Sequence, residues 1–365
     1  MKTYKNIFEK MVSVESLLNA WDEFKKRGKR KKRDVQVFEL RLEDNLFRLH
    51  RDLKNKRYKH GQYVGFYIRD PKVRHIHKAG VRDRIVHHAL FKYINPIFEP
   101  TFIADSYSAR IDKGTHKGVE RLSVFAQKVF QTHGKCLVLK CDIRKFFPTI
   151  DHKIMIEIID RRIKDPDAMW LIKIILGSFS SEFSGKGLKG APIGNLTSQL
   201  FANIYMNEFD QFIKHDLGVK YYIRYTDDFV IVHQDRNYLL ELQNKIADFL
   251  DANLKLSLHP DKVSIRKYRQ GIDFLGYVNL PKARVLRTKV RHRLFRKLKQ
   301  RVEEFRAGEI TEEILLRSFD SYLGVLSHAD SYELEQELRH KFWEWIKEPE
   351  SAKTKRDSRP AAHID

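Results

Sequence analysis

Three aspartates occur at positions where an active site could use them. Asp142 ends the apolar run 136–142, which predicts a buried strand, and Asp227-Asp228 separates two β-rich runs, 221–225 and 229–232. The second pattern predicts a hairpin with acidic residues at its tip. If these strands are neighbours in one sheet, the three carboxylates converge. Carboxylates on rigid strands can hold two Mg²⁺ ions about 3.5–4 Å apart, the arrangement used for phosphoryl transfer to a 3′-hydroxyl.

Each acid also has a plainer explanation. An Asp pair in a hairpin is usually turn chemistry, because Asp tolerates unusual backbone angles, and a lone Asp after a strand is usually a helix cap. Taken singly, these explanations are favoured. The joint pattern favours catalysis: Phe147 follows Asp142 by five positions, and a Gly-rich loop at 184–192 lies between the two acidic elements.

Helical and extended segments that could position these acids surround them. Residues 62–78 predict a hairpin with a turn at Asp70-Pro71. A helix is expected to start near Pro148–Asp151 and run to about Ile163. The other expected segments are a helical region over 1–60, helices over 83–98, 197–215 and 237–253, short segments at 255–268 and 272–280, and a helical unit over 282–346.

The charge balance predicts a polyanionic partner. Lys and Arg number 70 against 48 Asp and Glu, a net charge of +22, and phosphate contacts by such cations release counterions. Eight of the nine residues 25–33 are cationic, which predicts a solvated, phosphate-binding loop. A basic protein without a ligand, or one that meets acidic membranes, is the alternative. Cations placed beside aromatics suit nucleic acid better.

The remaining composition indicates an intracellular protein. No apolar run approaches the roughly 18–20 residues that span a bilayer, and the N-terminus lacks a signal-peptide core. We therefore expect a cytoplasmic protein without a membrane partner. Cys136 and Cys141 lack histidine partners at zinc-site spacing and are expected to be reduced structural thiols.

An ordered set of motifs resembles the bacterial reverse transcriptases. The palm-like motifs are Leu139–Asp151, Gly190–Gln199, Tyr225–Asp228, Leu256–Lys262 and Gly271–Tyr277, and the fingers-like motifs are Val81–Val86 and Ser106–Arg110. The resemblance covers roughly residues 65–345. It implies an α+β right-hand polymerase with fingers, a palm with an antiparallel sheet, and a helical thumb.

The resemblance also implies a division of the chain. A basic helical N-terminal extension would cover 1–60, and the fingers 61–135. The palm would cover 136–281, with a finger segment at about 155–190. A helical thumb would cover 282–347 and a disordered tail 348–365.

Catalytic roles follow from the resemblance, one position at a time. Asp142, Asp227 and Asp228 would bind two Mg²⁺ ions, which Mn²⁺ can replace, with help from the Ile143 carbonyl. Lys262 would protonate the leaving pyrophosphate.

Substrate contacts are implied in the same way. Phe147 would be the steric gate that selects dNTPs, whereas Phe146 is expected in the core. Arg74 and Arg110 would clasp the triphosphate, since Arg makes bidentate phosphate contacts. The other expected contacts are Ile193, Gly194 and Gln199 with the dNTP, Tyr225 with the primer terminus, and Phe274, Leu275 and Gly276 with the primer.

One departure from the usual pattern suggests a class. Ile193-Gly194 and Ser198-Gln199 stand where intron-type enzymes carry Gln-Gly and Ser-Pro, which is similar to the enzymes of diversity-generating retroelements. These copy a non-coding template RNA with errors at adenines, and a small basic accessory protein would be a further partner. The alternatives are a defence-associated, anti-phage reverse transcriptase, and a catalytically silent RNA-binding protein on a polymerase fold. An RNA-dependent RNA polymerase is disfavoured by Phe147.

Overall fold

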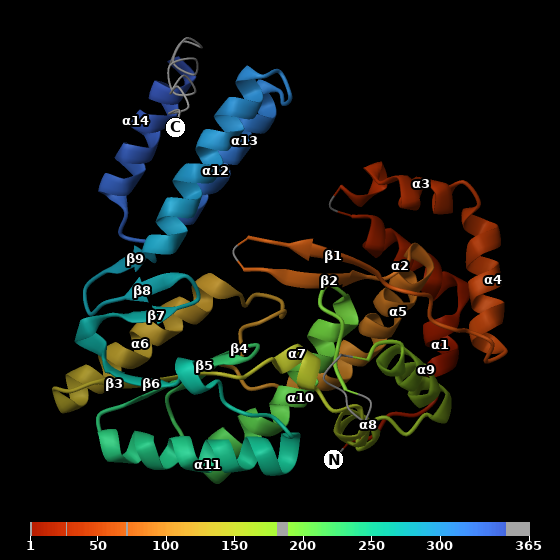
Figure 1. Cartoon of the computed structure of the whole chain (residues 1–365). Helices are drawn as coiled ribbons and strands as arrows, with labels where there is room; N and C mark the ends of the chain where they lie inside the picture. Colours follow the sequence, from red (N-terminus) through yellow and green to blue (C-terminus); the bar gives the residue numbers. More distant parts are fainter. Residues whose placement is uncertain (1, 27, 71, 181–188, 348–365) are drawn as a thin grey trace, which may run out of the picture. The chain divides into compact units, whose positions relative to one another are not determined.

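The computed structural model describes residues 2–26, 28–70, 72–180 and 189–347, which form two compact units (Figure 1). The first unit comprises Met1–Gly118 and Leu137–Ile265, and the second comprises Val119–Cys136 and Arg266–Asp365. The predicted tail at 348–365 and most of the Gly-rich loop lie outside the described residues.

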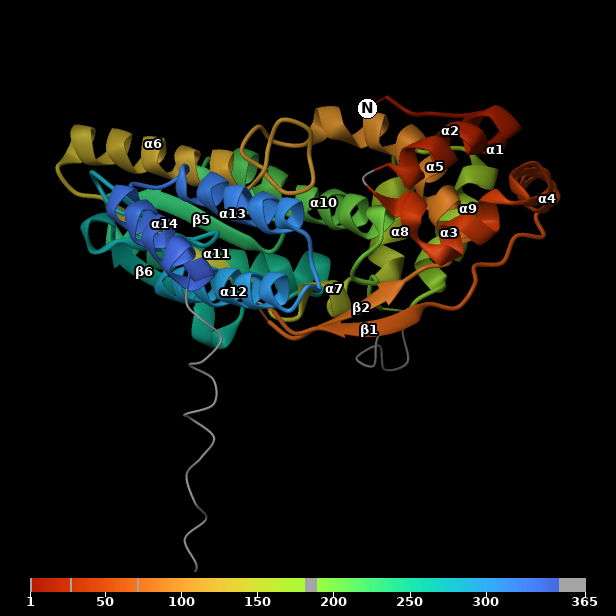
Figure 2. The ribbon, with the colours of Figure 1, turned by 90° about the horizontal axis from the view of Figure 1, so that it is seen from above.

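The N-terminal helices belong to the core of the first unit. Helices α1 (Phe8–Val12), α2 (Val14–Lys25) and α3 (Arg33–Glu39) pack against α5 (Val81–Phe98), and α4 (Leu42–Lys54) packs against α1, α2 and α3 (Figures 1 and 2). Trp21 and Phe24 are fully buried in a core that also contains Ile85 of α5. Residues 1–60, predicted as a separate N-terminal extension, fall within the first unit, because their apolar side chains are part of its core.

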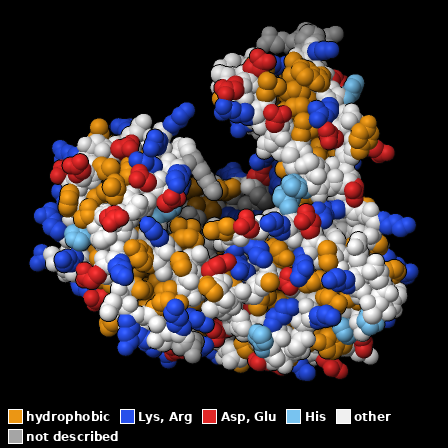
Figure 3. Space-filling view, turned by 180° about the vertical axis from the view of Figure 1, so that it is seen from behind, with side chains coloured by type: hydrophobic (Ala, Val, Ile, Leu, Met, Phe, Trp, Pro, Cys, Tyr) orange, Lys and Arg blue, Asp and Glu red, His pale blue; other side chains and the backbone are white. Residues whose placement is uncertain are grey.

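The basic run 25–33 is more ordered than a loop. Lys29–Lys31 form a short 3₁₀ helix (η1) and Arg33 begins α3, while Arg27 lies outside the described residues. Most of the described cations are exposed, as expected for a solvated segment. Figure 3 shows Lys and Arg scattered over the visible face with Asp and Glu between them, rather than gathered in one patch.

The hairpin predicted over residues 62–78 is confirmed. Strand β1 (Val64–Ile68) pairs antiparallel with β2 (Arg74–Lys78), and Phe66 lies opposite Ile76. Of the two predicted turn residues, Pro71 lies outside the described residues. The hairpin forms a two-stranded sheet of its own.

A four-stranded sheet in the order β4-β5-β3-β6 carries the three aspartates. Its strands are β3 (Leu137–Asp142), β4 (Tyr222–Tyr225), β5 (Asp228–His233) and β6 (Ser264–Lys267). Helices α10 (Leu196–Gln211) and α11 (Arg236–Leu254) share its core: Phe209 packs on Phe229 with ring centroids 5.0 Å apart. The strands and helices predicted around the acids are confirmed.

Helices α8 (His152–Asp160) and α9 (Pro166–Gly177) come directly before α10 among the described helices. Asp151 accepts hydrogen bonds from the Lys153 and Ile154 amides and so caps α8, as its start signal predicts. This helix ends at Asp160, earlier than the predicted Ile163, and is followed by α9. Asp165 caps α9 and also accepts from the Ile7 and Phe8 amides, which ties the N-terminus to this region.

The second unit combines a small sheet with a helical bundle. Strands β7 (Ile272–Phe274), β8 (Tyr277–Asn279) and β9 (Arg284–Leu286) form an antiparallel sheet. The bundle consists of α12 (Thr288–Arg306), α13 (Glu312–Leu326) and α14 (Tyr332–Lys347) around a core of its own. Most of α6 (Thr115–His133) also belongs here. Residues 266–281, predicted as palm, fall in this unit because β8 pairs with β9, which leads directly into α12.

Within the described residues, no helix is both long enough and apolar enough to cross a membrane.

His87 joins α5 to α10 through a buried hydrogen-bond chain. Its Nε2 lies 3.0 Å from His60 Nε2, and its Nδ1 lies 2.9 Å from the Thr197 hydroxyl. His60 Nδ1 faces the Gly61 carbonyl at 2.6 Å. That carbonyl can only accept, so His60 Nδ1 carries the proton of this hydrogen bond. Burial lowers the pKa of His87 to about 3, so the His87 ring is neutral within this chain of hydrogen bonds.

This buried histidine predicts a loss of stability in mild acid. Between about pH 6.5 and pH 3, His87 binds a proton in the unfolded chain but stays unprotonated in the folded chain. The free energy of unfolding should therefore fall by up to about 1.4 kcal/mol per pH unit below pH 6.5. Neighbouring His88, whose pKa burial lowers to about 4, adds to this slope. Urea unfolding at pH 7, 6 and 5 measures it.

His87→Gln provides the matched control, since Gln keeps one acceptor and one donor. It should reduce the pH slope without removing the share that belongs to His88. An identical slope in the variant would contradict the assignment.

Candidate active site

The tip of the β4–β5 hairpin brings two of the aspartates to the sheet edge. Tyr225 pairs with Asp228, so Thr226 and Asp227 form a two-residue turn, in which Thr226 has a left-handed φ of 58°. On the other side of β5, Asp228 lies directly opposite Asp142 of β3. The predicted adjacency of the two acidic strands is confirmed.

The charged side chains around Asp227 change its pKa. Burial, together with the negative charge of Asp142, raises the pKa of Asp227 to about 6, while the charges of Lys262 and Arg74 act in the opposite direction. Lys262 Nζ lies 2.9 Å from an Asp142 carboxylate oxygen. Lys140 Nζ lies 4.0 Å from Asp228. Carboxylates of like charge are thus held together in a partly desolvated place, which favours the arrival of cations.

Backbone pairing brings Lys262 to this place from 120 positions along the chain. The Arg144 amide donates to the Ser257 carbonyl at 2.9 Å, and the His259 amide donates to the Asp142 carbonyl at 2.8 Å. The short 3₁₀ helix η4 (Pro260–Lys262) then turns the lysine side chain onto Asp142.

The candidate metal ligands are the carboxylate oxygens of Asp142, Asp227 and Asp228. In the part of the chain that the structure describes, no group of three or more His, Cys, Asp or Glu side chains is arranged to hold a metal ion. Mg²⁺, however, binds through one or two carboxylates together with water and substrate phosphates. Asp142 and Asp228 on adjacent strands, with Asp227 at the turn, are oxygen donors of this kind. The residues fit Mg²⁺, and the two-ion site stays a prediction.

Phe146 and Phe147 have different environments, as predicted. Both lie on the short helix α7 (Phe146–Thr149), with ring centroids 5.4 Å apart. Phe146 is buried in the core, which confirms its expected packing role. Phe147 is only half-buried, so its ring is available to a ligand.

A loop that contains Ile193 and Gly194 is tied to β2. The His77 amide donates to the Ile193 carbonyl at 3.0 Å, and the Asn195 side chain donates to the His77 carbonyl at 2.9 Å. Gly194 has φ 113°, and an added Cβ would lie 2.8 Å from the Ile76 side chain. Glycine is therefore needed at 194 by both backbone angle and close approach.

The other predicted nucleotide contacts differ in their exposure. Arg74 begins β2 and is exposed, and its charge reaches Asp227. Gln199 is exposed on the first turn of α10. Both can meet a ligand. Tyr225, whose hydroxyl lies 3.4 Å from that of Thr115, is partly exposed beside the acids.

Arg110 does not fit its predicted role. Its Nε donates to Glu99 at 2.7 Å, and one terminal nitrogen donates to the carbonyls of Ile103 and Ser106. The side chain is 8% exposed. These contacts give Arg110 a structural role in its own segment and do not support a triphosphate contact.

The prediction that the Phe274 side chain contacts the primer also needs a correction. Its ring is fully buried in the second unit, so the side chain itself cannot grip a primer. Leu275 and Gly276 form the turn between β7 and β8, with φ of 52° and 93°, and are partly exposed. Any primer contact of this segment would come from its turn.

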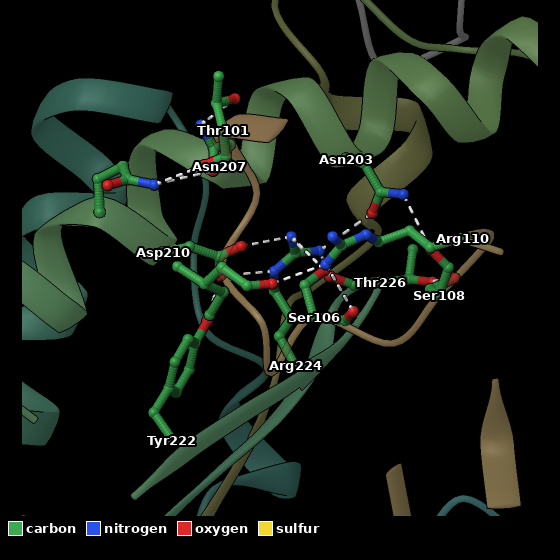
Figure 4. A network of polar contacts seen from close by, with 12 residues as sticks. Thr101, Ser106, Ser108, Arg110, Asn203, Asn207, Asp210, Tyr222, Arg224 and Thr226 are labelled. Carbon is green, nitrogen blue, oxygen red and sulfur yellow. Dashed lines mark hydrogen bonds and ion pairs between the residues drawn. The ribbon is translucent and has the colours of Figure 1, made fainter. Parts of the chain in front are cut away.

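The sequence analysis missed a buried polar network beneath the hairpin tip (Figure 4). Its centre is Arg224, which is fully buried and pairs with Asp210 of α10. A signal for it exists: Arg224 is the one cation in the otherwise uncharged run 221–225, and Asp210 interrupts the apolar face of its helix.

Comparisons with known proteins agree with this geometry. The family described as reverse transcriptase (RNA-dependent DNA polymerase) matches residues 65–279, more than half of the chain. Protein YkfC of Escherichia coli (strain K12) is 26% identical over 289 residues, which cover 70% of this chain and 71% of that protein.

Other relatives include intron proteins. Group II intron-encoded protein LtrA of Lactococcus lactis subsp. cremoris is 23% identical over 259 residues, covering 53% of this chain and 42% of LtrA. The putative COX1/OXI3 intron 2 protein of Saccharomyces cerevisiae is 24% identical over 198 residues, 38% of this chain and 23% of that protein. The chain thus spans less than half the length of these two relatives.

The family match takes in the β1–β2 hairpin and all three aspartates, on a fold of helices and antiparallel sheet. The chain belongs to the reverse transcriptase family and is an RNA-directed DNA polymerase with the right-hand polymerase fold.

Proposed function

We propose that this chain makes cDNA by nucleotidyl transfer at Asp142, Asp227 and Asp228. The observation that carries the proposal is the direct pairing of Asp142 with Asp228, one residue after Asp227. These carboxylates, with the Ile143 carbonyl, would hold two Mg²⁺ ions, for which Mn²⁺ can substitute. Divalent ions at this site supply charge neutralisation for the attacking 3′-oxygen and the leaving pyrophosphate.

The chain's own cations act beside the carboxylates. Lys262 is held 2.9 Å from Asp142, and its ammonium can give a proton to the leaving pyrophosphate. Arg74 is exposed, and its positive charge, like that of Lys262, lowers the pKa of Asp227. Arg74 is our candidate for the triphosphate contact. Tyr225 would position the primer end.

Phe147 would select the sugar. It follows Asp142 by five positions and is half-buried, with Phe146 packed behind it. A rigid ring at this place would leave no room for a 2′-hydroxyl. The template would be RNA, held with its growing hybrid through backbone phosphates.

The finer class that we propose is a diversity-generating retroelement enzyme with errors at adenines. Support comes from the aliphatic Ile193 and from Gln199, which depart from the intron-type pattern. An aliphatic side chain cannot make polar contacts that hold a nucleotide in one geometry, so discrimination against mispairs should weaken. Its partners would be a non-coding template RNA and a small basic accessory protein. The second candidate is an intron-associated enzyme, favoured by the resemblance to LtrA.

Asp227→Asn should abolish dNTP incorporation and leave RNA affinity nearly unchanged. Asn keeps the shape of the side chain but removes the charge that a divalent ion requires. Primer extension and RNA binding on the same preparation measure the two effects. Asp248→Asn, an exposed position on α11, is the control. Comparable loss of binding and incorporation would contradict the catalytic assignment, and retained incorporation would favour a silent RNA-binding scaffold.

Phe147→Ala should admit ribonucleotides. Removing the ring opens space for a 2′-hydroxyl, so the ratio of rNTP to dNTP incorporation should rise about tenfold or more. Single-nucleotide extension with each substrate measures the ratio. Phe146→Leu perturbs the buried neighbour and should leave the ratio unchanged. An unaltered ratio in the Phe147 variant would remove the gate.

Ile193→Gln should raise fidelity. The added amide can make the polar contact that the aliphatic side chain lacks, so the frequency of errors at adenines should fall several-fold. The error spectrum is measured by sequencing cDNA copied from the non-coding template RNA. Ile193→Val is the apolar control. Faithful copying by the unaltered enzyme, or an unchanged spectrum in the variant, would count against the retroelement class.

A further inference from the structure

Arg224 carries a fully buried charge two positions before the catalytic turn. Its Nε donates to one Asp210 oxygen at 2.7 Å and its Nη2 to the other at 2.6 Å, a bidentate pair (Figure 4). Both side chains are completely inaccessible to solvent. Burial lowers the pKa of Arg224, but the charge and hydrogen bonds of Asp210 outweigh this effect and raise it. The guanidinium therefore stays charged.

The guanidinium also reaches the turn itself. Its Nη1 donates to the Thr226 carbonyl at 3.1 Å. This carbonyl belongs to the peptide group that joins Thr226 to Asp227. Thr226 has a left-handed φ of 58°, a conformation that is strained for a β-branched residue and persists only where its surroundings impose it. Arg224 is one of those constraints.

A second constraint comes from the segment 105–110. The Thr226 hydroxyl donates to Ser108 Oγ at 2.6 Å, and Arg224 Nη2 donates to Ser106 Oγ at 3.1 Å. The backbone pairs as well: the Arg224 amide donates to the Asp105 carbonyl and the Tyr107 amide to the Arg224 carbonyl. Arg110 holds this segment through the carbonyls of Ile103 and Ser106.

The buried pair is therefore poorly explained by stability alone. The free-energy cost of removing two charges from water offsets much of the attraction between them. A well-packed apolar pair would therefore stabilise the fold as well or better. An apolar pair could not donate to the Thr226 carbonyl.

We propose that Arg224 is a positioning residue that fixes the Thr226–Asp227 peptide, and through it the direction of the Asp227 carboxylate. Ser106 and Ser108 support it from the neighbouring segment. The inference rests on the catalytic role proposed for Asp227. Misplacing a catalytic group by about 1 Å can cost about a hundredfold in rate, so loss of this contact should appear in the rate of the chemical step.

Arg224→Lys tests this proposal. Lys is a single point donor that can still pair with Asp210 but cannot also reach Thr226 and Ser106. On a preformed RNA template with a DNA primer, kcat for nucleotide addition should fall at least tenfold. The KM for dNTP and the affinity for the template-primer should stay within twofold. Tyr222→Phe is the matched control: it removes an equally buried hydrogen bond to Asp210 at 2.7 Å that does not involve the turn. It should lower Tm with kcat within twofold.

The outcomes separate this proposal from the one on which it rests. If Asp227→Asn abolishes incorporation while Arg224→Lys loses activity only in proportion to its folded fraction, the positioning role is overturned and the catalytic assignment stands. If Asp227→Asn retains incorporation, the catalytic assignment itself fails. Should Arg224→Lys not fold, Ser108→Ala removes the partner of the Thr226 hydroxyl. It should lower kcat at least threefold with little change in Tm, and an unchanged kcat would overturn the proposal.

Discussion

The register of β3 against β5 is the constraint on which the site depends. Side chains on a strand alternate between two faces, so a slip of one residue would turn Asp142 away from Asp228. The register is set by buried pairs along the two strands, including Leu139 opposite Ile231 and Cys141 opposite Phe229. The buried apolar pairs along β3 and β5 thus determine that Asp142 and Asp228 lie opposite each other at the strand ends. The same strand end continues into the Ile143–Leu258 bridge, which brings in Lys262.

Repulsion among the three carboxylates destabilises the fold. Nearby lysines reduce this repulsion, although each ion pair is weak. The ammonium groups of Lys262 and Lys140 face the acids without closing them off, since both lysines remain partly exposed. Exposed ion pairs of this kind contribute at most about 1 kcal/mol each. They can therefore be displaced when substrate arrives. Beneath the turn, the Arg224 network is fully buried and cannot be exchanged in this way.

Local patterns predicted the acidic hairpin and most of the described strands and helices, because periodicity and turn chemistry are encoded over a few residues. Helices α6 and α9 were not predicted. What failed were roles that depend on how a side chain is buried or paired in the fold. Arg110 was expected at a triphosphate, but Glu99 and two carbonyls hold it. Phe274 was expected at a primer, but its ring is core. A motif fixes which residue is present, whereas burial decides which of its atoms a ligand can reach. Arg224 and Asp210 each stand out in the sequence, but only the fold shows that they pair with each other.

The loop that contains Ile193, for which we propose a role in specificity, is held in place by other atoms than the Ile193 side chain. Its attachment to β2 uses the Ile193 carbonyl and the Asn195 side chain, and the sharp approach to Ile76 is made by Gly194. None of these contacts involves the Ile193 side chain. A change from aliphatic to polar at 193 therefore leaves the loop in place and alters only what its half-buried side chain presents. If Ile193 and the carboxylates have the roles proposed for them, a substitution at 193 changes fidelity while the carboxylates, whose positions depend on the separate β3–β5 register, stay in place.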